Sequence, residues 1–324
     1  MYRILSLDGG GIRGALTATL LDRLQEAVPG FLNRVNMFAG TSTGGLLALG
    51  LARGLTPREC RALYENHGSE IFQRSPVSAL ADIFRAKYRN DRLAARLREQ
   101  FGDLTLGDLA VKGKHVLISS FDLDNGPDNR QGVRMWKAKF YHNLDPSDPD
   151  CTERMVDVAL RTSAAPAYFP VYDGHIDGGV AANNPSMCAL AQALAADKPL
   201  GEVALLSVGT GLNPRIVEAQ NANWGWLRWA RFPVRRLASA PSMPGQPGHD
   251  LIIDLLIEGT VDVAHYQCRQ ILKVRFHRLS PTLPEPIDLD RVDQLGRLAE
   301  IARAASLSDV KTGAPTIDFL KNYF

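Results

Sequence analysis

The first half of the chain alternates short apolar runs with longer segments of helical periodicity. Arg3–Leu7 and Val35–Ala39 have the length of buried strands, whereas Ala15–Val28 repeats leucines at the three- and four-residue spacing of a helix. Further strand-like runs are His115–Phe121, Val133–Ala138 and Val203–Val208. Strands that alternate with helices in this order predict an α/β fold in which helices flank a central, mostly parallel sheet.

The helices have recognisable starts. Thr56, Pro57 and Glu59 form a capping signal, with Thr as the cap, Pro in the first turn and Glu three residues after the cap. Further predicted helices are Thr152–Thr162, Pro185–Ala196, Asp250–Ala264 and Arg291–Ala305, and a last strand is predicted over Gln270–Phe276. The sequence contains no repeat or linker. We therefore expect one domain over residues 1–324, with its motifs in residues 3–210 and completing elements in residues 211–324.

Composition narrows the class of protein. Of the 324 residues, 45% are hydrophobic and 22% are charged, as in ordinary globular proteins. The 37 basic residues nearly balance the 35 acidic ones, and a net charge of +2 is small for a protein that binds nucleic acid by neutralising phosphates. The four cysteines are widely separated, which argues against a zinc site or a redox pair. We expect neither a metal nor another cofactor.

The sequence also lacks targeting signals. Its N-terminus does not resemble a signal peptide, and no uncharged apolar run approaches the roughly 20 residues that cross a bilayer. We therefore expect a cytoplasmic protein that associates at most peripherally with the inner membrane face.

A serine flanked by glycines is the strongest local candidate for chemistry. Gly40-Thr41-Ser42-Thr43-Gly44 lies between a predicted strand and a predicted helix. Gly40 and Gly44 allow the sharp turn, or elbow, that lifts a nucleophilic hydroxyl clear of the backbone. The pattern therefore indicates Ser42 as a nucleophile.

The glycine-rich loop after the first strand allows two interpretations. Gly9-Gly10-Gly11-Ile12-Arg13-Gly14 fits a dinucleotide fingerprint, but the next strand ends in Ala39-Gly40 without the carboxylate that would hold a ribose. A non-enzymatic nucleotide-binding module is therefore the weaker interpretation. In the other interpretation, the amides of this loop and the charge of Arg13 stabilise an oxyanion that develops beside Ser42.

A third motif, Asp177-Gly178-Gly179, supplies a carboxylate that can act as a base. Together and in this order, the Asp8–Gly14 loop, the Gly40–Gly44 elbow and this motif resemble the patatin-like phospholipase family. The resemblance implies an acyl hydrolase of the phospholipase A or lysophospholipase type, with a Ser–Asp dyad and no histidine. It implies that Ser42 is the nucleophile and Asp177 the general base. The oxyanion hole implied by the resemblance comprises Gly9, Gly10, Gly11 and Arg13.

A carboxylesterase with a Ser-His-Asp triad is the nearest alternative, because three histidines follow Asp177 in the chain. These histidines are His249, His265 and His277. However, Ser42 follows only one complete strand–helix unit, whereas that fold places several strands before its nucleophile. The glycine loop also begins with Asp8 rather than with the histidine of that group. These two features favour the dyad.

Residues 219–249 differ in composition from the rest, with three tryptophans, four arginines and no acidic residue. Trp224, Trp226 and Trp229 are candidate membrane contacts, because tryptophan and arginine suit a bilayer surface. The expected partners are a phospholipid substrate and a membrane surface. Resemblance to bacterial enzymes that cyclic nucleotides activate in antiphage defence adds a cyclic nucleotide as a candidate activator.

Overall fold

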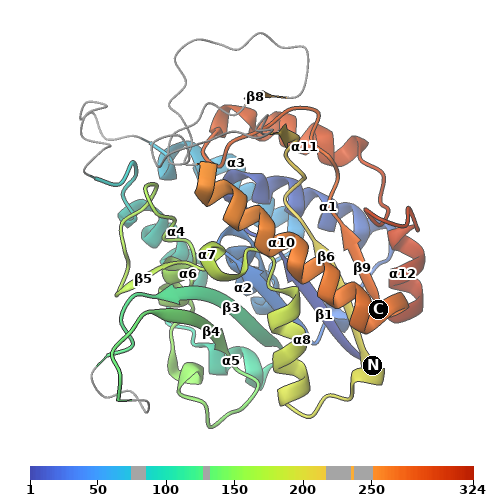
Figure 1. The fold of residues 1–324 in the computed structure, drawn as a ribbon, viewed down its shortest axis with the longest axis horizontal. Helices are drawn as coiled ribbons and strands as arrows, with labels where there is room; N and C mark the ends of the chain where they lie inside the picture. Colours follow the sequence, from blue (N-terminus) through green and yellow to red (C-terminus); the bar gives the residue numbers. More distant parts are fainter. Residues whose placement is uncertain (74–84, 127–131, 217–234, 237–250) are drawn as a thin grey trace, which may run out of the picture.

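A seven-stranded sheet lies at the centre of the protein (Figure 1). The computed structural model describes residues 1–73, 85–126, 132–216, 235–236 and 251–324. The strands of this sheet are β1 (Tyr2–Leu7), β2 (Met37–Thr41), β3 (His115–Asp122), β4 (Lys137–His142), β5 (His175–Asp177), β6 (Val203–Val208) and β9 (Phe276–Leu279). A separate two-stranded pair comprises β7 (Arg215–Ile216) and β8 (Arg235–Arg236).

The main sheet has the strand order β4-β3-β2-β1-β6-β9, and β5 pairs with β3 off this path. Strands β1, β2, β3, β6 and β9 are parallel, whereas β4 and β5 are antiparallel to β3. The predicted α/β class with a mostly parallel sheet is therefore confirmed. The parallel strands all end at one edge of the sheet, which we call the carboxyl edge. Binding and catalytic sites of α/β proteins lie at such an edge.

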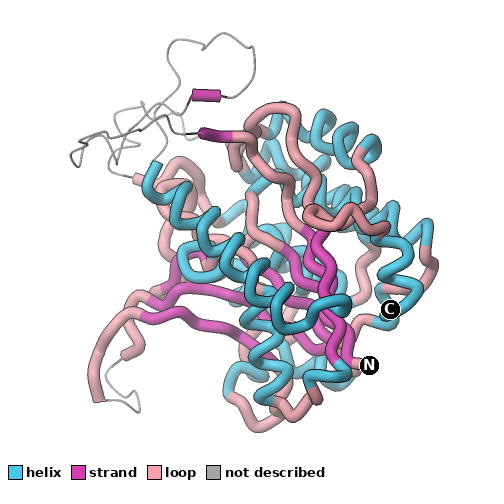
Figure 2. Tube along the Cα trace, turned by 45° about the vertical axis from the view of Figure 1, so that its right-hand side comes forward, coloured by secondary structure: helices cyan, strands magenta, loops and turns pink. Residues whose placement is uncertain are grey.

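Helices cover both faces of this sheet (Figure 2). They are α1 (Gly14–Ala27), α2 (Thr43–Arg53), α3 (Pro57–Ile71), α4 (Asp91–Phe101), α5 (Leu106–Val111), α6 (Met155–Thr162), α7 (Gly179–Ala182), α8 (Ser186–Ala195), α10 (Leu251–Leu272), α11 (Leu295–Ala304) and α12 (Thr316–Tyr323). Because side chains alternate along a strand, Leu5 packs with α1, α2 and α6, whereas Ile4 packs with α8 and α10 on the opposite face. None of the helices in the described ranges combines the length and hydropathy that crossing a bilayer requires.

The start of α3 confirms the capping signal. The Thr56 hydroxyl oxygen accepts a hydrogen bond from the Glu59 amide at 3.2 Å. In return, the Glu59 carboxylate accepts one from the Thr56 amide at 2.7 Å. Both orphan donors of the first turn are thereby satisfied.

The predicted strand over Gln270–Phe276 is wrong, because α10 continues to Leu272 and β9 begins only at Phe276. Cys268 and Leu272 lie four residues apart and pack onto the same face of the sheet. A short apolar run does not distinguish this helical spacing from a buried strand.

The predicted strand over Val133–Ala138 is displaced, since β4 begins at Lys137. Val133 and Trp136 precede the strand and are exposed by 59% and 69%. Their apolar character therefore does not reflect burial in the sheet.

Candidate active site

Ser42 occupies a sharp turn between β2 and α2 at the carboxyl edge. Its φ of 52° and ψ of −124° lie in a region that residues other than glycine rarely adopt. A Cβ on Gly40 would collide with the carbonyl oxygen of Gly44, and a Cβ on Gly44 would collide with the backbone of Leu7. The turn that carries Ser42 therefore requires both glycines.

The register of the sheet brings Asp177 to the same point. β4 occupies one side of β3 through to its last residue, so β5 must pair with the other side, directly beyond the end of β2. On that side Thr41 is opposite Ser119, and Asp177 is opposite the next residue, Ser120. Because β5 is antiparallel to β3, its carboxyl end points back towards β2. Ser42 and Asp177 therefore meet, although they are far apart in the sequence.

Asp177 is a buried carboxylate beside the Ser42 hydroxyl. Its Oδ1 accepts a hydrogen bond from the Gly179 amide at 2.7 Å. Only 6% of the residue is exposed. Burial raises the pKa of the Asp177 carboxyl to about 6, although the neighbouring Ser42 hydroxyl and the Gly179 amide act in the opposite direction. Such a carboxylate is ionised at neutral pH and can accept a proton from a neighbouring hydroxyl.

The end of α6 contacts the backbone of both residues. The Ser42 amide donates to Thr162 Oγ1 at 2.8 Å, and the Asp177 amide donates to the carbonyl oxygen of Ala164 at 2.9 Å. No pattern in the sequence indicated Thr162 and Ala164 as site residues, because a helical pattern does not show what lies beside the end of the helix. This segment links the Ser42 turn to β5.

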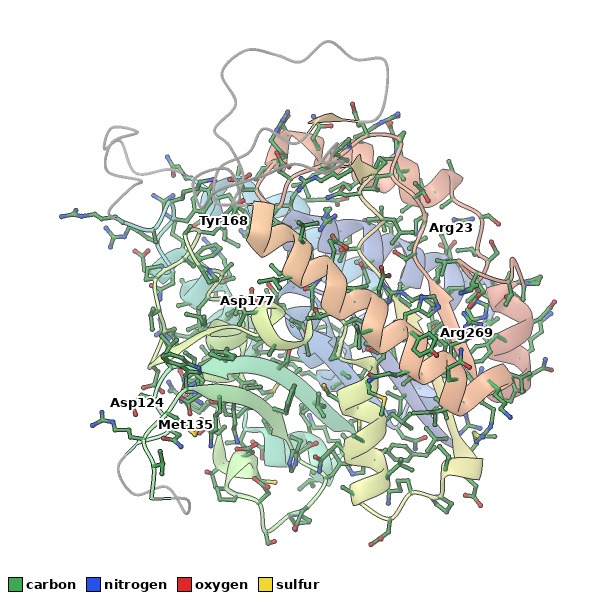
Figure 3. All side chains as sticks on the ribbon, in the orientation of Figure 1. Arg23, Asp124, Met135, Tyr168, Asp177 and Arg269 are labelled. Atoms are coloured by element: carbon green, nitrogen blue, oxygen red, sulfur yellow. The ribbon has the colours of Figure 1, made fainter. Side chains whose placement is uncertain are left out.

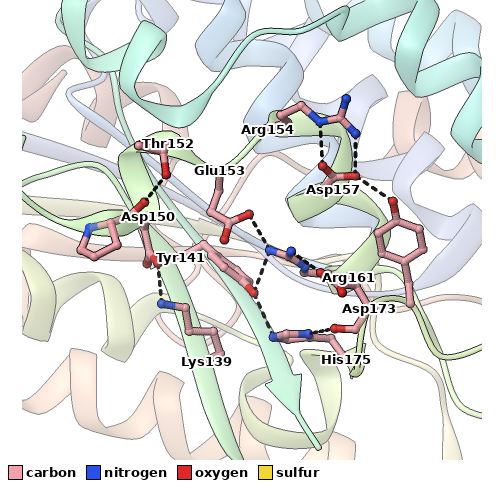
Figure 4. Close-up of polar contacts among 12 residues, drawn as sticks. Lys139, Tyr141, Asp150, Thr152, Glu153, Arg154, Asp157, Arg161, Asp173 and His175 are labelled. Carbon is pink, nitrogen blue, oxygen red and sulfur yellow. Dashed lines mark hydrogen bonds and ion pairs between the residues drawn. The ribbon is translucent and has the colours of Figure 1, made fainter. Parts of the chain in front are cut away.

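Arg161 holds the turn that leads into β5 (Figure 4). Its guanidinium donates to Glu153, Tyr141 and Asp173. The Tyr141 hydroxyl also shares a hydrogen bond of 2.9 Å with His175 Nε2. Since β5 has only three residues, these contacts supplement a short ladder and help to position Asp177.

The glycine-rich loop after β1 lies beside the Ser42 turn, since a Cβ on Gly9 would be 3.4 Å from the Ser42 Cβ. The Gly9 amide donates to the carbonyl oxygen of Asn183 at 3.0 Å. Within the described ranges, the Gly10 and Gly11 amides have no hydrogen-bond acceptor. Two consecutive donors near Ser42 can therefore stabilise negative charge.

Two buried arginines hold this loop. Arg13, which is 5% exposed, donates from Nε to the carbonyl oxygen of Gly10 at 3.4 Å. Asp8, at the start of the loop, forms a two-pronged ion pair with Arg278 of β9. Burial raises the pKa of the Asp8 carboxyl, while the neighbouring Arg278 and Arg13 act in the opposite direction. No pattern in the sequence indicated Arg278 as a site residue, because its partner Asp8 lies at the other end of the chain.

Ser42 and Asp177 line a cavity of about 530 Å³ at the carboxyl edge. Its walls come from the glycine-rich loop, from α2, α3 and α4, and from the segment after α6. Its apolar lining includes Leu47, Leu63, Ile71, Leu97, Phe101 and Phe169. Figure 3 shows Asp177 near the middle of the molecule, with Tyr168, another lining residue, above it. An apolar cavity next to a serine hydroxyl and a buried carboxylate has the chemical character to hold an aliphatic chain.

The described histidines give no support to a Ser-His-Asp triad. The ring of His175 contacts Tyr141 and Asp173, the ring of His265 contacts Arg269, and the ring of His277 contacts Thr316. His67 lines the cavity but pairs with Glu70 of its own helix at 3.5 Å. Several sequence candidates lie outside the described residues, namely His249, Trp224, Trp226 and Trp229.

One group of side chains has the composition of a metal site. His142, Asp148 and Asp150 bring one ligand atom each within 4.8 Å of one another. However, Lys139 Nζ lies 2.5 Å from Asp150 Oδ1, and the His142 amide donates to Asp150 Oδ2 at 3.3 Å. Lys139 therefore already neutralises Asp150, the most buried carboxylate of this group. None of the three residues of the group lines the cavity.

The chain is similar in sequence to several known proteins. The profile of a family described as Patatin-like phospholipase matches residues 5–190, which include the Ser42 turn, the glycine-rich loop and Asp177. CotR of Bacillus subtilis is 32% identical over 87% of this chain and 88% of its own length. A cGAMP-activated phospholipase of Pseudomonas aeruginosa is 36% identical over 64% of this chain and 62% of its own length. Patatin-12 of Solanum tuberosum is 29% identical over 89% of this chain and 79% of its own length.

Proposed function

The chain belongs to the patatin-like phospholipase family and is a lipid acyl hydrolase, and on this premise we propose that a Ser42–Asp177 dyad cleaves ester bonds of membrane phospholipids. The observation that carries the proposal is the position of the Ser42 hydroxyl beside the buried Asp177 carboxylate, where both line an apolar cavity. We assign the whole chain to one hydrolase domain, because β6 and β9 extend the sheet that β1, β2 and β3 begin.

The reaction begins when Ser42 Oγ attacks the ester carbonyl carbon and Asp177 accepts the hydroxyl proton. As the carbon–oxygen bond breaks, Asp177 passes this proton to the leaving alcohol, and the acyl group stays on Ser42. Asp177 then accepts a proton from water, which attacks the acyl-enzyme. The attack of water forms a second tetrahedral intermediate, as the attack of Ser42 formed the first. Breakdown of this second intermediate releases the fatty acid and returns the proton to Ser42.

The residues of the glycine-rich loop have different roles in this reaction. The amides of Gly10 and Gly11 stabilise the oxyanion of both tetrahedral intermediates. The Gly9 amide is not one of these donors, because it already donates to the Asn183 carbonyl oxygen. Arg13 adds positive charge and holds the Gly10 carbonyl. Gly40 and Gly44 shape the elbow, and each has a backbone group where a side chain would lie.

The apolar cavity receives the acyl chain of the substrate, and the ester group then lies at Ser42. The names of two relatives, both described as cGAMP-activated phospholipases, support a phospholipid substrate. They also favour a second candidate property, activation of this chain by a cyclic nucleotide. Phospholipid hydrolysis that is equal with and without cGAMP would exclude activation by this cyclic nucleotide.

Labelling with a fluorophosphonate, followed by peptide mass spectrometry, tests the dyad. We expect the label on Ser42 and no label on the Ser42→Ala variant. Ser163→Ala is the matched control, because Ser163 also lines the cavity but its hydroxyl donates to the Ala159 carbonyl at 2.7 Å. We expect Ser163→Ala to label as the unmodified protein does. Label on another serine, or phospholipid hydrolysis by a folded Ser42→Ala protein, contradicts the proposal.

A further inference from the structure

Exposed apolar side chains gather where β3 ends and β4 begins, in residues 123–126 and 132–136, which we call the β3–β4 hairpin. Its described residues include Leu123, Val133, Met135 and Trp136, which are 38%, 59%, 50% and 69% exposed. Trp136 is thus a large aromatic side chain with most of its surface outside the core. Contiguous exposed apolar groups of this kind mark interaction surfaces.

The stem of the hairpin is held by specific contacts. The Asn125 amide donates to the Met135 carbonyl oxygen at 3.1 Å, and the Met135 amide donates to Asn125 Oδ1 at 2.9 Å. Arg134 forms an ion pair with Asp124. The Leu123 amide donates to the Gly174 carbonyl oxygen at 2.9 Å, in the turn before β5. The exposed side chains therefore stand on a fixed scaffold that is joined to the strand carrying Asp177.

The sheet register shows in which direction the hairpin extends. Ser120 of β3 is opposite Asp177, and β3 continues past it to Asp122 before the hairpin begins. Because β3 is parallel to β2, this extension leaves the sheet at the carboxyl edge, where Ser42 lies. At about 3.3 Å per residue, Asp122 at the end of β3 is roughly 7 Å beyond Ser120 along the strand direction. Figure 3 shows Asp124 and Met135 at the outer end of these strands, away from Asp177.

The chemistry of the hairpin fits a lipid surface. From Asp122 to Lys137 the sequence carries three acidic and three basic residues, so the segment has no net charge. Any attraction of this segment to a lipid surface must therefore come from its apolar groups rather than from net charge. Tryptophan is enriched where a bilayer meets water, because its ring is apolar and its N–H remains able to bind polar groups.

We propose that the β3–β4 hairpin inserts Met135 and Trp136 into the headgroup region of a phospholipid bilayer, and so holds the carboxyl edge of the sheet against the lipid. This inference rests on the proposed function, because it assumes a substrate that resides in the bilayer. The hairpin contributes binding to the surface and takes no part in bond cleavage.

The chain offers a matched control at the opposite edge of the sheet. Val111 ends α5, shortly before β3 starts, and Val274 lies in the turn before β9. These valines are 89% and 74% exposed, so they present apolar surface comparable to that of the hairpin. Their position before parallel strands places them away from the carboxyl edge.

Co-sedimentation with phosphatidylcholine vesicles tests the proposal. Binding is measured in a Ser42→Ala background, so the result does not depend on hydrolysis. We expect Met135→Ser/Trp136→Ser to lower vesicle binding by about 10-fold or more, since two large apolar groups no longer leave water. Val111→Ser/Val274→Ser should bind as the unmodified protein does. The single variants Met135→Ser and Trp136→Ser provide the same measurement if the double variant folds poorly.

The second measurement is hydrolysis by variants that retain Ser42. Met135→Ser/Trp136→Ser should hydrolyse a soluble short-chain ester at an unchanged rate but lose activity on vesicles. Unchanged vesicle binding by this variant, or an equal loss in the valine control, overturns the proposal. A monomeric variant of a protein that is otherwise dimeric also overturns it, since the hairpin would then join two copies. If the hairpin variant loses binding while no ester is cleaved by the unmodified protein, docking stands and the proposed function fails.

Discussion

At Asp177 a single side chain is subject to opposing requirements. The proposed base must be ionised, but burial raises its pKa from 3.8 to about 6 and so favours the neutral form in the folded chain. A folded pKa above the unfolded pKa gives stability that is fully present below about pH 4 and is lost as the pH rises through about 6. The complete shift corresponds to about 3 kcal/mol of unfolding free energy.

The Asp177→Asn variant should therefore be inactive yet more stable. At pH 8 we expect its free energy of unfolding to exceed that of the unmodified protein by up to about 3 kcal/mol, because the amide does not ionise. At pH 4 the two proteins should differ little. Urea unfolding at both pH values measures the difference, and equal stabilities at pH 8 would show that the buried carboxylate does not destabilise the fold.

Thr162 acts on Ser42 through the backbone, as a positioning residue. Its Oγ1 accepts a hydrogen bond from the amide of Ser42, whose backbone conformation is strained. The Thr162 hydroxyl therefore helps to hold the elbow. Thr162→Val keeps the shape and removes the acceptor, and we expect kcat on a soluble ester to fall about tenfold or more with little change in KM. Thr162→Ser keeps the hydroxyl and should retain most of the activity. Equal kcat values for the two variants would contradict this role.

At the scale of elements, the loops of the site depend on strands that are remote in sequence. The glycine-rich loop follows β1, but Asp8 at its start is held by Arg278 of β9. Both side chains are buried, with 3% of Arg278 and 5% of Asp8 exposed. Arg278 also donates to Ser207 Oγ of β6 at 2.6 Å. The position of the loop thus depends on the complete sheet rather than on its N-terminal strands alone.

Removing one partner of this ion pair should destabilise the fold strongly. We expect Arg278→Met to lower the free energy of unfolding by about 3–5 kcal/mol, because the Asp8 carboxylate is left buried without its cation. Replacing both partners, in Asp8→Leu/Arg278→Met, should restore much of that loss. Urea unfolding of the two variants measures both effects. A loss below about 1 kcal/mol in the single variant would show that water or Arg13 replaces the missing partner.

At the scale of the whole molecule, the carboxyl edge gathers three features that arise from different parts of the chain. The Ser42 turn and β5 meet there, α3 and α4 provide apolar walls of the cavity, and the β3–β4 hairpin extends beyond it. The helices on the two faces bury separate apolar clusters and leave this edge for chemistry. In the described part of the chain, the proposed site and the proposed docking surface therefore lie at the same edge of the sheet.

The size of the cavity should limit the length of the acyl chain. Leu63 of α3 lines the cavity, and Leu63→Trp would fill part of its volume of about 530 Å³. We expect kcat/KM for a palmitoyl ester to fall about tenfold or more, while that for a butyryl ester changes little. Steady-state kinetics on p-nitrophenyl esters of both lengths provides the comparison. A parallel loss on both esters would indicate a disturbed Ser42 rather than a shortened cavity.

Local steric rules made several features of this protein predictable from its sequence. A serine between two glycines, after an apolar run and before a helical one, predicts the elbow, because only glycine fits the close approaches at Gly40 and Gly44. The alternation of strands and helices likewise predicts the α/β class. These inferences depend only on neighbours in the chain.

Contacts between remote segments were decided by the tertiary structure alone. Asp177 reaches Ser42 because β5 pairs with β3 beyond the end of β2, and that register depends on strands that no local pattern relates. Thr162 and Arg278 reach the site in the same way, from a helix end and an edge strand. Trp136 shows the converse, since an apolar residue that suits a buried strand is 69% exposed. Apolar character encodes a tendency to leave water, whereas the packed fold determines which surface covers each side chain.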